Sequence, residues 1–362
     1  MSISIRNFFI ITFIFLLNPN EIKAQLLSSS SEVKEEVKIP DDSLGRRNPR
    51  GTVNGFLKAV SEQNYIRASN YLYLKRSFRK NKERERIVKT MQNLLDQSGS
   101  IVPTSLISDK NTGNSDDELD AELDLVGTIS INGKNVKLYV ENNEREGSAP
   151  IWLFSAETVD AIAAVKVDEN LLVNKILPES LKERLLAGVP IGQWFIIIVL
   201  VAGAYFLSWG IIALLTFIIS KLWKKARTEP TEGFLVALSL PIQLYIALWF
   251  FIDFSQRVGI SIIIRQRFSY LTVTVGIVAF LMLLWRITDF IGEFSKNRMT
   301  VKGRVSTISA ILFLRRTFKV AIFIFGGIAI LGAIGIDVTA GLAALGIGGI
   351  ALALGAQKTV EN

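Results

Sequence analysis

The side chains that most often carry out chemistry are scarce in this sequence. Its 362 residues include no His and no Cys, which removes the commonest general base, the commonest metal ligand and all thiolate or disulfide chemistry. An acidic run, Asp116-Asp117-Glu118 with Asp120, offers carboxylates but lacks the spacing of an EF-hand calcium loop. We therefore interpret this run as a solvated loop, and we predict no catalytic residue, no metal site and no cofactor.

The stretch from Val338 to Gln357 indicates a function that depends on hydrophobicity and helix packing rather than on reactive side chains. It is apolar and uncharged over about the length that crosses a bilayer, and it is crowded with Gly and Ala. Small residues in a membrane helix let neighbouring backbones approach closely. At 100° per residue they form two flanks beside a narrow face. The flanks are Gly346, Gly349 and Ala353, and Ala344, Gly348, Ala351 and Gly355; the face between them is Ala343, Ile347, Ile350, Leu354 and Gln357.

A helix with two close-packing flanks predicts two close neighbours. Repeated by symmetry, this arrangement forms a homo-oligomeric ring with the Ile and Leu face turned to a central axis, whereas Leu345 and Leu352 point the opposite way. The pattern thus predicts a pore with an apolar constriction. The alternative is tight packing inside a monomeric bundle, because small-residue spacing alone is a weak signal.

The composition is that of a membrane protein. Hydrophobic residues make up 49% of the chain and the formal charge is +8. The basic residues lie mainly in loops between apolar blocks, where they orient membrane helices, so we predict no nucleic-acid partner.

The N-terminus has the pattern of a secretory signal peptide over residues 1–24. Arg6 supplies the positive charge, residues 8–17 the apolar segment, and Ala24 a cleavage point; the apolar segment is short for a membrane helix. Residues 25–45 are Ser-rich and charged, as in a flexible linker.

Residues 46–185 are predicted to form a soluble α+β domain. Apolar residues at helical spacing indicate a helical hairpin over 52–74 and an amphipathic helix over 87–95. Asn132-Gly133 between two alternating segments indicates a β-hairpin with a type I′ turn. A strand over 151–154 and a helix over 156–165 complete the expected elements.

Five predicted transmembrane spans follow this domain, so the fold class is a mostly α membrane protein. They cover residues 189–220, 233–252 with an interruption at Pro241, 268–285, 305–336 with its membrane part at 320–336, and 338–362. Loops on one side of these spans carry 12 basic residues and loops on the other side carry 3. The positive-inside rule then places the N-terminal domain outside, in agreement with the signal peptide.

The last hairpin resembles a known family. GLAALGIGGIALALGAQKTVEN, from Gly341 to Asn362, is similar without gaps to the pore-lining third helix of the small-conductance mechanosensitive (MscS) channel family. The segment from Asp42 to Leu72, beginning DSLGRRNPRGTVNGFLKAV, resembles an extracytoplasmic domain of larger members.

The resemblance implies a ring, commonly a heptamer, in the inner membrane of a Gram-negative bacterium with the N-terminal domain in the periplasm. The two apolar rings of the seal fall on Ile350 and Leu354. Membrane tension would open this seal and release ions and small solutes during hypo-osmotic shock. Lys358 stands where many members have a Gly at which the pore helix bends, and the resemblance implies a cytoplasmic domain after Asn362.

Several further residues have two interpretations each. Arg315, Arg316 and Lys319 are candidate lipid anchors or positive-inside residues that reach the bilayer surface. For Asp337 the two interpretations are sensing at the outer mouth of the pore and, as we predict, capping of the last helix. Competing functions are a secondary transporter, for which internal repeats and intramembrane charges are missing, and a membrane-anchored periplasmic sensor.

Overall fold

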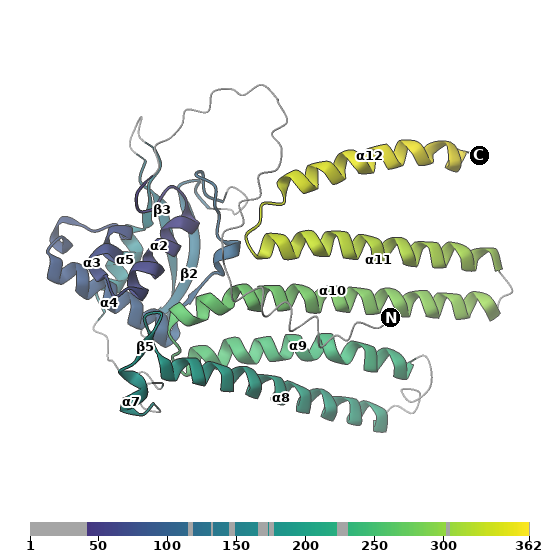
Figure 1. Cartoon of the computed structure of the whole chain (residues 1–362), viewed down its shortest axis with the longest axis horizontal. Coiled ribbons are helices and arrows are strands. Elements are labelled where there is room, and N and C mark those ends of the chain that lie inside the picture. Colours follow the sequence, from purple (N-terminus) through teal and green to yellow (C-terminus); the bar gives the residue numbers. More distant parts are fainter. Residues whose placement is uncertain are drawn as a thin grey trace. The chain divides into compact units, whose positions relative to one another are not determined.

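The computed structural model describes residues 42–114, 119–131, 133–144, 149–165, 173, 177–222, 231–301 and 305–361. An α+β region is followed along the chain by long helices (Figure 1). The predicted signal peptide, most of the predicted linker and the acidic run at 116–118 lie outside the described residues.

The α+β region contains a four-stranded antiparallel sheet with short helices. The strands are arranged in the order β1-β2-β3-β4. The sheet comprises β1 (Ser100–Ile101), β2 (Leu123–Ile131), β3 (Lys134–Asn142) and β4 (Trp152–Phe154). The helical elements are α2 (Pro49–Ser61), α3 (Tyr65–Ala68), η1 (Ser69–Tyr71), η2 (Arg76–Phe78), α4 (Asn81–Ser98), η3 (Thr104–Leu106) and α5 (Ala156–Ala163).

The predicted β-hairpin is confirmed. β2 pairs with β3 from Leu123↔Glu141 to Ile131↔Lys134. Gly133 has a φ of +77°, a conformation that the tight turn requires and that glycine adopts without strain. The other turn residue, Asn132, lies outside the described residues.

The predicted helical hairpin is also confirmed, although its second helix is short. Asn48 begins α2 by accepting a hydrogen bond from the Gly51 amide (2.7 Å), with Pro49 at the first helical position. After α2 the chain turns and continues as one turn of α3 and then η1. Gly55 allows a close approach between the two arms, because a Cβ there would lie 2.4 Å from the Tyr71 ring.

The DSLGRRNPR segment ties several loops together. Arg46 donates to both carboxylate oxygens of Asp42 (each 3.0 Å) and to the Asn70 carbonyl (2.9 Å). These hydrogen bonds lower the pKa of Asp42 to about 2. Arg47 donates to the Pro150 carbonyl (3.0 Å), and Arg50 to the Ile107 carbonyl (2.9 Å). The segment therefore has a clear structural role.

Small elements connect this region to five long helices. The small elements are α7 (Glu179–Lys182), β5 (Leu185–Leu186) and β6 (Val189–Pro190). The long helices are α8 (Ile191–Leu222), α9 (Thr231–Arg257), α10 (Ile262–Val301), α11 (Val305–Ala333) and α12 (Thr339–Glu361). Among the described residues, three segments are long and apolar enough to cross a membrane: Ile191–Leu222, Leu235–Arg257 and Ile262–Met299.

Two of these helices differ from the sequence prediction. α9 continues through Pro241 without a break, so the predicted interruption is wrong. The ring of a proline removes one hydrogen-bond donor, but neighbouring packing often keeps such a helix intact. α10 has 40 residues and extends well beyond the predicted 268–285 at both ends.

Helices α8 to α11 pack in chain order, α8 on α9, α9 on α10 and α10 on α11 (Figure 1). The contact between α10 and α11 is close at Gly326, where an added Cβ would lie 2.5 Å from Leu281 Cδ1. Gly326 therefore lets the two backbones approach each other in the way small residues do in membrane helices.

Candidate functional site: the C-terminal hairpin and the α4–α10 junction

Helix α12 carries the predicted pore-lining residues and is exposed on all sides within one chain. The side chains of Ile347, Ile350 and Leu354 are 72%, 65% and 65% exposed. All other α12 residues whose side chains are described are exposed as well, including the predicted lining residues Ala343 and Gln357. One chain therefore leaves both the predicted face and its flanks uncovered.

The small residues of α12 also face open space. A Cβ added at Gly346, Gly348, Gly349 or Gly355 would meet no atom within 4 Å. Ala344, Ala351 and Ala353 are exposed too. Within one chain these residues do not serve close packing, in contrast to Gly326 of α11, which is buried against α10.

A tight turn joins α11 to α12. The Ile336 amide donates to the Leu331 carbonyl (3.0 Å) and Gly335 has a φ of +86°, which together form a Schellman-type helix end. The Thr339 amide then donates to Asp337 Oδ1 (2.9 Å), as the predicted capping role requires. Hydrogen bonds from the side chain of Thr339 and from this amide lower the pKa of Asp337. α12 continues as helix through Gly355 and the position of Lys358 to Glu361.

A charge cluster joins α11 to α10 beyond the predicted membrane part of both helices. Arg315 donates to Asp289 Oδ1 (2.7 Å) and to Glu293 Oε1 (3.0 Å). Lys319 pairs with the same Asp289 oxygen (2.6 Å), and its ammonium lies 4.4 Å from the centre of the Trp285 ring. Two of the three candidate lipid anchors are thus bound to α10.

The third candidate anchor behaves differently. Arg316 is exposed, and it forms no ion pair among the residues that the structure describes. A lipid headgroup would compete with Asp289 and Glu293 for Arg315 and Lys319, but it would meet no such competition at Arg316. A lipid headgroup could therefore bind Arg316 without breaking an ion pair of the cluster. At Arg315 or Lys319 it would have to replace the ion pairs with α10.

At the other end of α10, this helix and α4 cap each other. Asp96, near the C-terminus of α4, accepts a hydrogen bond from the Ile262 amide at the start of α10 (2.6 Å). In return, Arg265 of α10 donates to the carbonyls of Leu95 and Gly99 at the end of α4, the latter at 2.9 Å. The Ile262 amide and the Gly99 carbonyl thus gain partners from the other helix, because groups at a helix end have none within their own helix, while the Leu95 carbonyl also accepts from the Gly99 amide (3.2 Å).

Two glutamines extend this α4–α10 junction. Gln193 of α8 accepts from the Ser261 amide (2.9 Å). Gln266 of α10 donates to the Val102 carbonyl (3.0 Å) and to Thr104 Oγ1 (2.6 Å). Asp96 and both glutamines are at most 7% exposed. Polar groups buried in this way are costly to leave without partners, so the junction resists separation.

Burial dominates the electrostatics of Asp96. Desolvation raises the pKa of this carboxyl from its ordinary 3.8 to about 7, against the opposing effects of the Ile262 amide, Arg265 and Ser261. Arg265 acts on Asp96 through space, while its hydrogen bonds go to the carbonyls of Leu95, Gly99 and Ile260.

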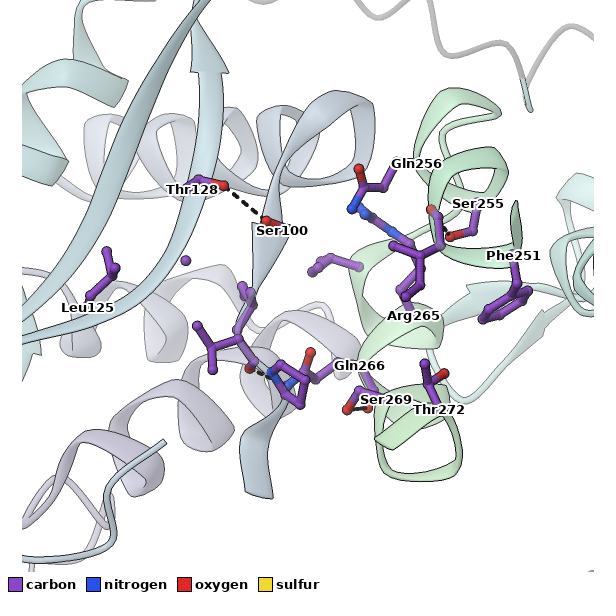
Figure 2. A pocket seen from close by; sticks show the side chains of 16 residues that line it. Ser100, Leu125, Thr128, Phe251, Ser255, Gln256, Arg265, Gln266, Ser269 and Thr272 are labelled. Carbon is purple, nitrogen blue, oxygen red and sulfur yellow. Dashed lines mark hydrogen bonds between the residues drawn. The ribbon is translucent and has the colours of Figure 1, made fainter. Parts of the chain in front are cut away.

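A cavity of about 380 Å³ lies beside the junction. Strands β1 and β2 form one wall, and the end of α9 with the start of α10 forms the other (Figure 2). Figure 2 shows Arg265 and Gln266 on the α10 side and Thr128 and Ser100 on the sheet side, the last two joined by a 2.9 Å hydrogen bond.

Sequence reasoning missed this junction completely. Its residues are separated by as many as 170 positions along the chain. The only local signal was Arg265, which counted as one of three basic residues on the side that carries few. The distribution of loop charges does not indicate that Arg265 forms hydrogen bonds at a junction between two helices.

Comparison with known proteins bears on the C-terminal hairpin. Residues 316–357 match the family model described as mechanosensitive ion channel, transmembrane helices 2/3. The match covers α11 from its middle, the Asp337 turn and most of α12. Comparisons with curated proteins and with solved structures gave no match. By this hairpin, the chain is similar to the mechanosensitive ion channel family.

Proposed function

We propose that this chain is one subunit of an ion channel that membrane tension opens. The observation that carries the proposal is α12, an apolar, glycine-rich helix that is exposed on every side in one chain and lies in the segment matched to the channel family. Other copies of the chain would cover its two Gly/Ala flanks. The expected assembly is a ring, commonly a heptamer in this family.

The seal would consist of two rings of apolar side chains from Ile350 and Leu354. These residues lie about one turn apart on one face of α12. A narrow apolar ring stays dry because its walls offer water no hydrogen-bond partner, and a dry pore passes no ions. Tension favours the wider state, since that state occupies more bilayer area. The packed helices then separate, the ring becomes wet, and ions and small solutes pass.

We propose five transmembrane helices with the α+β region outside and the C-terminus inside. Three of the helices meet the length and hydropathy of a membrane span, and the similarity of residues 316–357 to a model of channel transmembrane helices 2/3 supports two more. The loop charges and the signal-peptide pattern support this orientation, in the inner membrane of a Gram-negative bacterium. Reporter fusions after Arg227 and after Asp337 test it: an externally active reporter at the first site, or an internally active one at the second, would contradict the topology.

The α+β region would modulate gating or assembly. It packs directly on the start of α10 through the α4–α10 junction. Deletion of residues 46–180 should therefore leave a stretch-activated conductance with a shifted threshold. Loss of all conductance from a variant that still reaches the membrane would show that the region is essential to the pore itself.

Patch-clamp recording under suction tests the channel function. Membrane patches containing the full chain should show a conductance that appears only above a threshold of tension. A secondary transporter would give no such unitary conductance. Tension-independent transport of a solute, with no stretch-activated current, would reject the proposal.

A further inference from the structure

The α4–α10 junction buries a carboxylate that has few partners of its own. Asp96 is 6% exposed and accepts one hydrogen bond from a backbone amide, that of Ile262. The adjacent guanidinium of Arg265 directs its hydrogen bonds to three backbone carbonyls. The charged form of Asp96 is therefore incompletely compensated, and a neutral acid would fit the site better.

The remaining surroundings of Asp96 supply no second compensating charge. From α8 the side chain that reaches the junction is the uncharged Gln193. Ser261 precedes α10 and is buried, and its uncharged hydroxyl acts on Asp96 as a hydrogen-bonding group that lowers the pKa of the carboxyl only in part. On α9, which also packs on α4, Asp253 and Arg257 pair with each other at 2.7 Å. Arg265 is thus the charged group that acts on Asp96 among the described residues.

We propose that the junction is a proton-sensitive latch: a proton on Asp96 holds the α+β region on the N-terminus of α10, and loss of that proton loosens the contact. The residue belongs to the region that we place outside the membrane. The latch would therefore respond to the pH on that side and would be tightest in acid.

The sign follows from proton linkage. In the closed junction Asp96 titrates near pH 7, whereas a solvated Asp in an opened junction would titrate near its ordinary 3.8. Between these values the closed state binds a proton that the open state does not, so acid favours closure. This advantage is complete below pH 3.8 and is lost as the pH rises through 7. From pH 5.5 to 8.5 the opening equilibrium should increase about 30-fold.

Hydrogen exchange at the start of α10 measures this equilibrium in the full-length chain. The Ile262 amide is protected only while Asp96 of α4 accepts its hydrogen bond, whereas the Ser261 amide donates to Gln193 of α8, which is not part of the α+β region. The protection factor of the Ile262 amide, corrected for the intrinsic pH dependence of exchange, should fall by tenfold or more between pH 5.5 and 8.5. The measurement requires no channel current, so its failure is distinct from failure of the proposed function.

Two substitutions make the test specific. Asp96→Asn keeps an acceptor for the Ile262 amide but has no proton to lose, so protection should stay at its acid value at both pH values. Asp253→Asn is the matched control, since this carboxylate is already paired at the end of α9, and it should leave the pH dependence unchanged. The proposal is wrong if protection is independent of pH in the unaltered chain, or if Asp96→Asn retains the same pH dependence.

Discussion

The α4–α10 junction and helix α12 differ in whether one chain buries their functional side chains and supplies their contacts. At the junction, the polar groups of Asp96, Gln193 and Gln266 are at most 7% exposed and have their partners within one chain. On α12, the side chain of Ile347 is 72% exposed, and a Cβ added at any glycine of the two flanks would have no atom within 4 Å. A junction of the first kind fixes the α+β region on α10. A helix of the second kind is incomplete until lipid or further copies of the chain cover it.

The largest expected effect is on α12. Leu354→Ser places a hydroxyl at the proposed seal, which lowers the barrier to wetting. The channel should open at lower tension or leak at rest, and it should slow the growth of cells that express it. Patch-clamp thresholds and growth curves measure both effects.

Leu352→Ser is the control for this variant, because the sequence places Leu352 opposite the proposed lumen. It is expected to affect folding or the transfer of tension, but not to cause the same leak. Equal leakiness in both variants, or a normal threshold for Leu354→Ser, would mean that the wrong face of α12 has been assigned to the pore.

The next effect concerns the junction. Arg265→Ala would remove the donor to the Gly99 carbonyl, one of the two donors to the Leu95 carbonyl, and the charge beside Asp96. Leaving buried carbonyl acceptors short of a donor costs about 1–3 kcal/mol. The loss should appear as a lower midpoint of denaturation and faster proteolysis of the α+β region in the full chain.

Arg267→Ala is the matched control for Arg265→Ala, since Arg267 is an exposed arginine two positions along α10. It should change the stability by less than about 0.5 kcal/mol. Similar losses from both substitutions would show that helix propensity, rather than the reciprocal capping, stabilises this end of α10.

A smaller effect is expected where α11 pairs with α10. A double-mutant cycle of Asp289→Ala and Arg315→Ala should give a coupling energy of about 1 kcal/mol or more, because the two side chains are only about one quarter exposed. Arg316→Ala should show almost no coupling with Asp289→Ala. Measuring the unfolding of the four variants tests whether α11 is joined to α10 by charge as well as by packing.

The smallest expected effect is on gating. If the junction restrains α10 while the channel opens, the tension threshold should fall as the outer pH rises from 5.5 to 8.5, because the charged Asp96 weakens the closed junction. Asp96→Asn should remove this dependence. A threshold that rises with outer pH would reverse the assignment of acid to the tighter state.

The sequence by itself predicted the helices and strands that depend on local pattern. Hydrophobic periodicity gave the α2 and α4 helices, and Asn132-Gly133 gave the β2–β3 hairpin. The unbroken apolar stretch and its small residues gave α12, since length, hydropathy and helical spacing are properties of neighbouring residues. Asp337 was found in the same way, because a cap lies next to the helix that it begins.

Only the tertiary structure decided which distant residues share an environment. Nothing near Asp96 in the sequence indicates that it caps a helix that begins 166 positions later, or that burial there raises the pKa of its carboxyl. Likewise, Arg315 and Arg316 are adjacent and chemically identical, yet only Arg315 faces Asp289 and Glu293. Desolvation and ion pairing depend on what surrounds a side chain in space, and the packing of whole helices sets those surroundings.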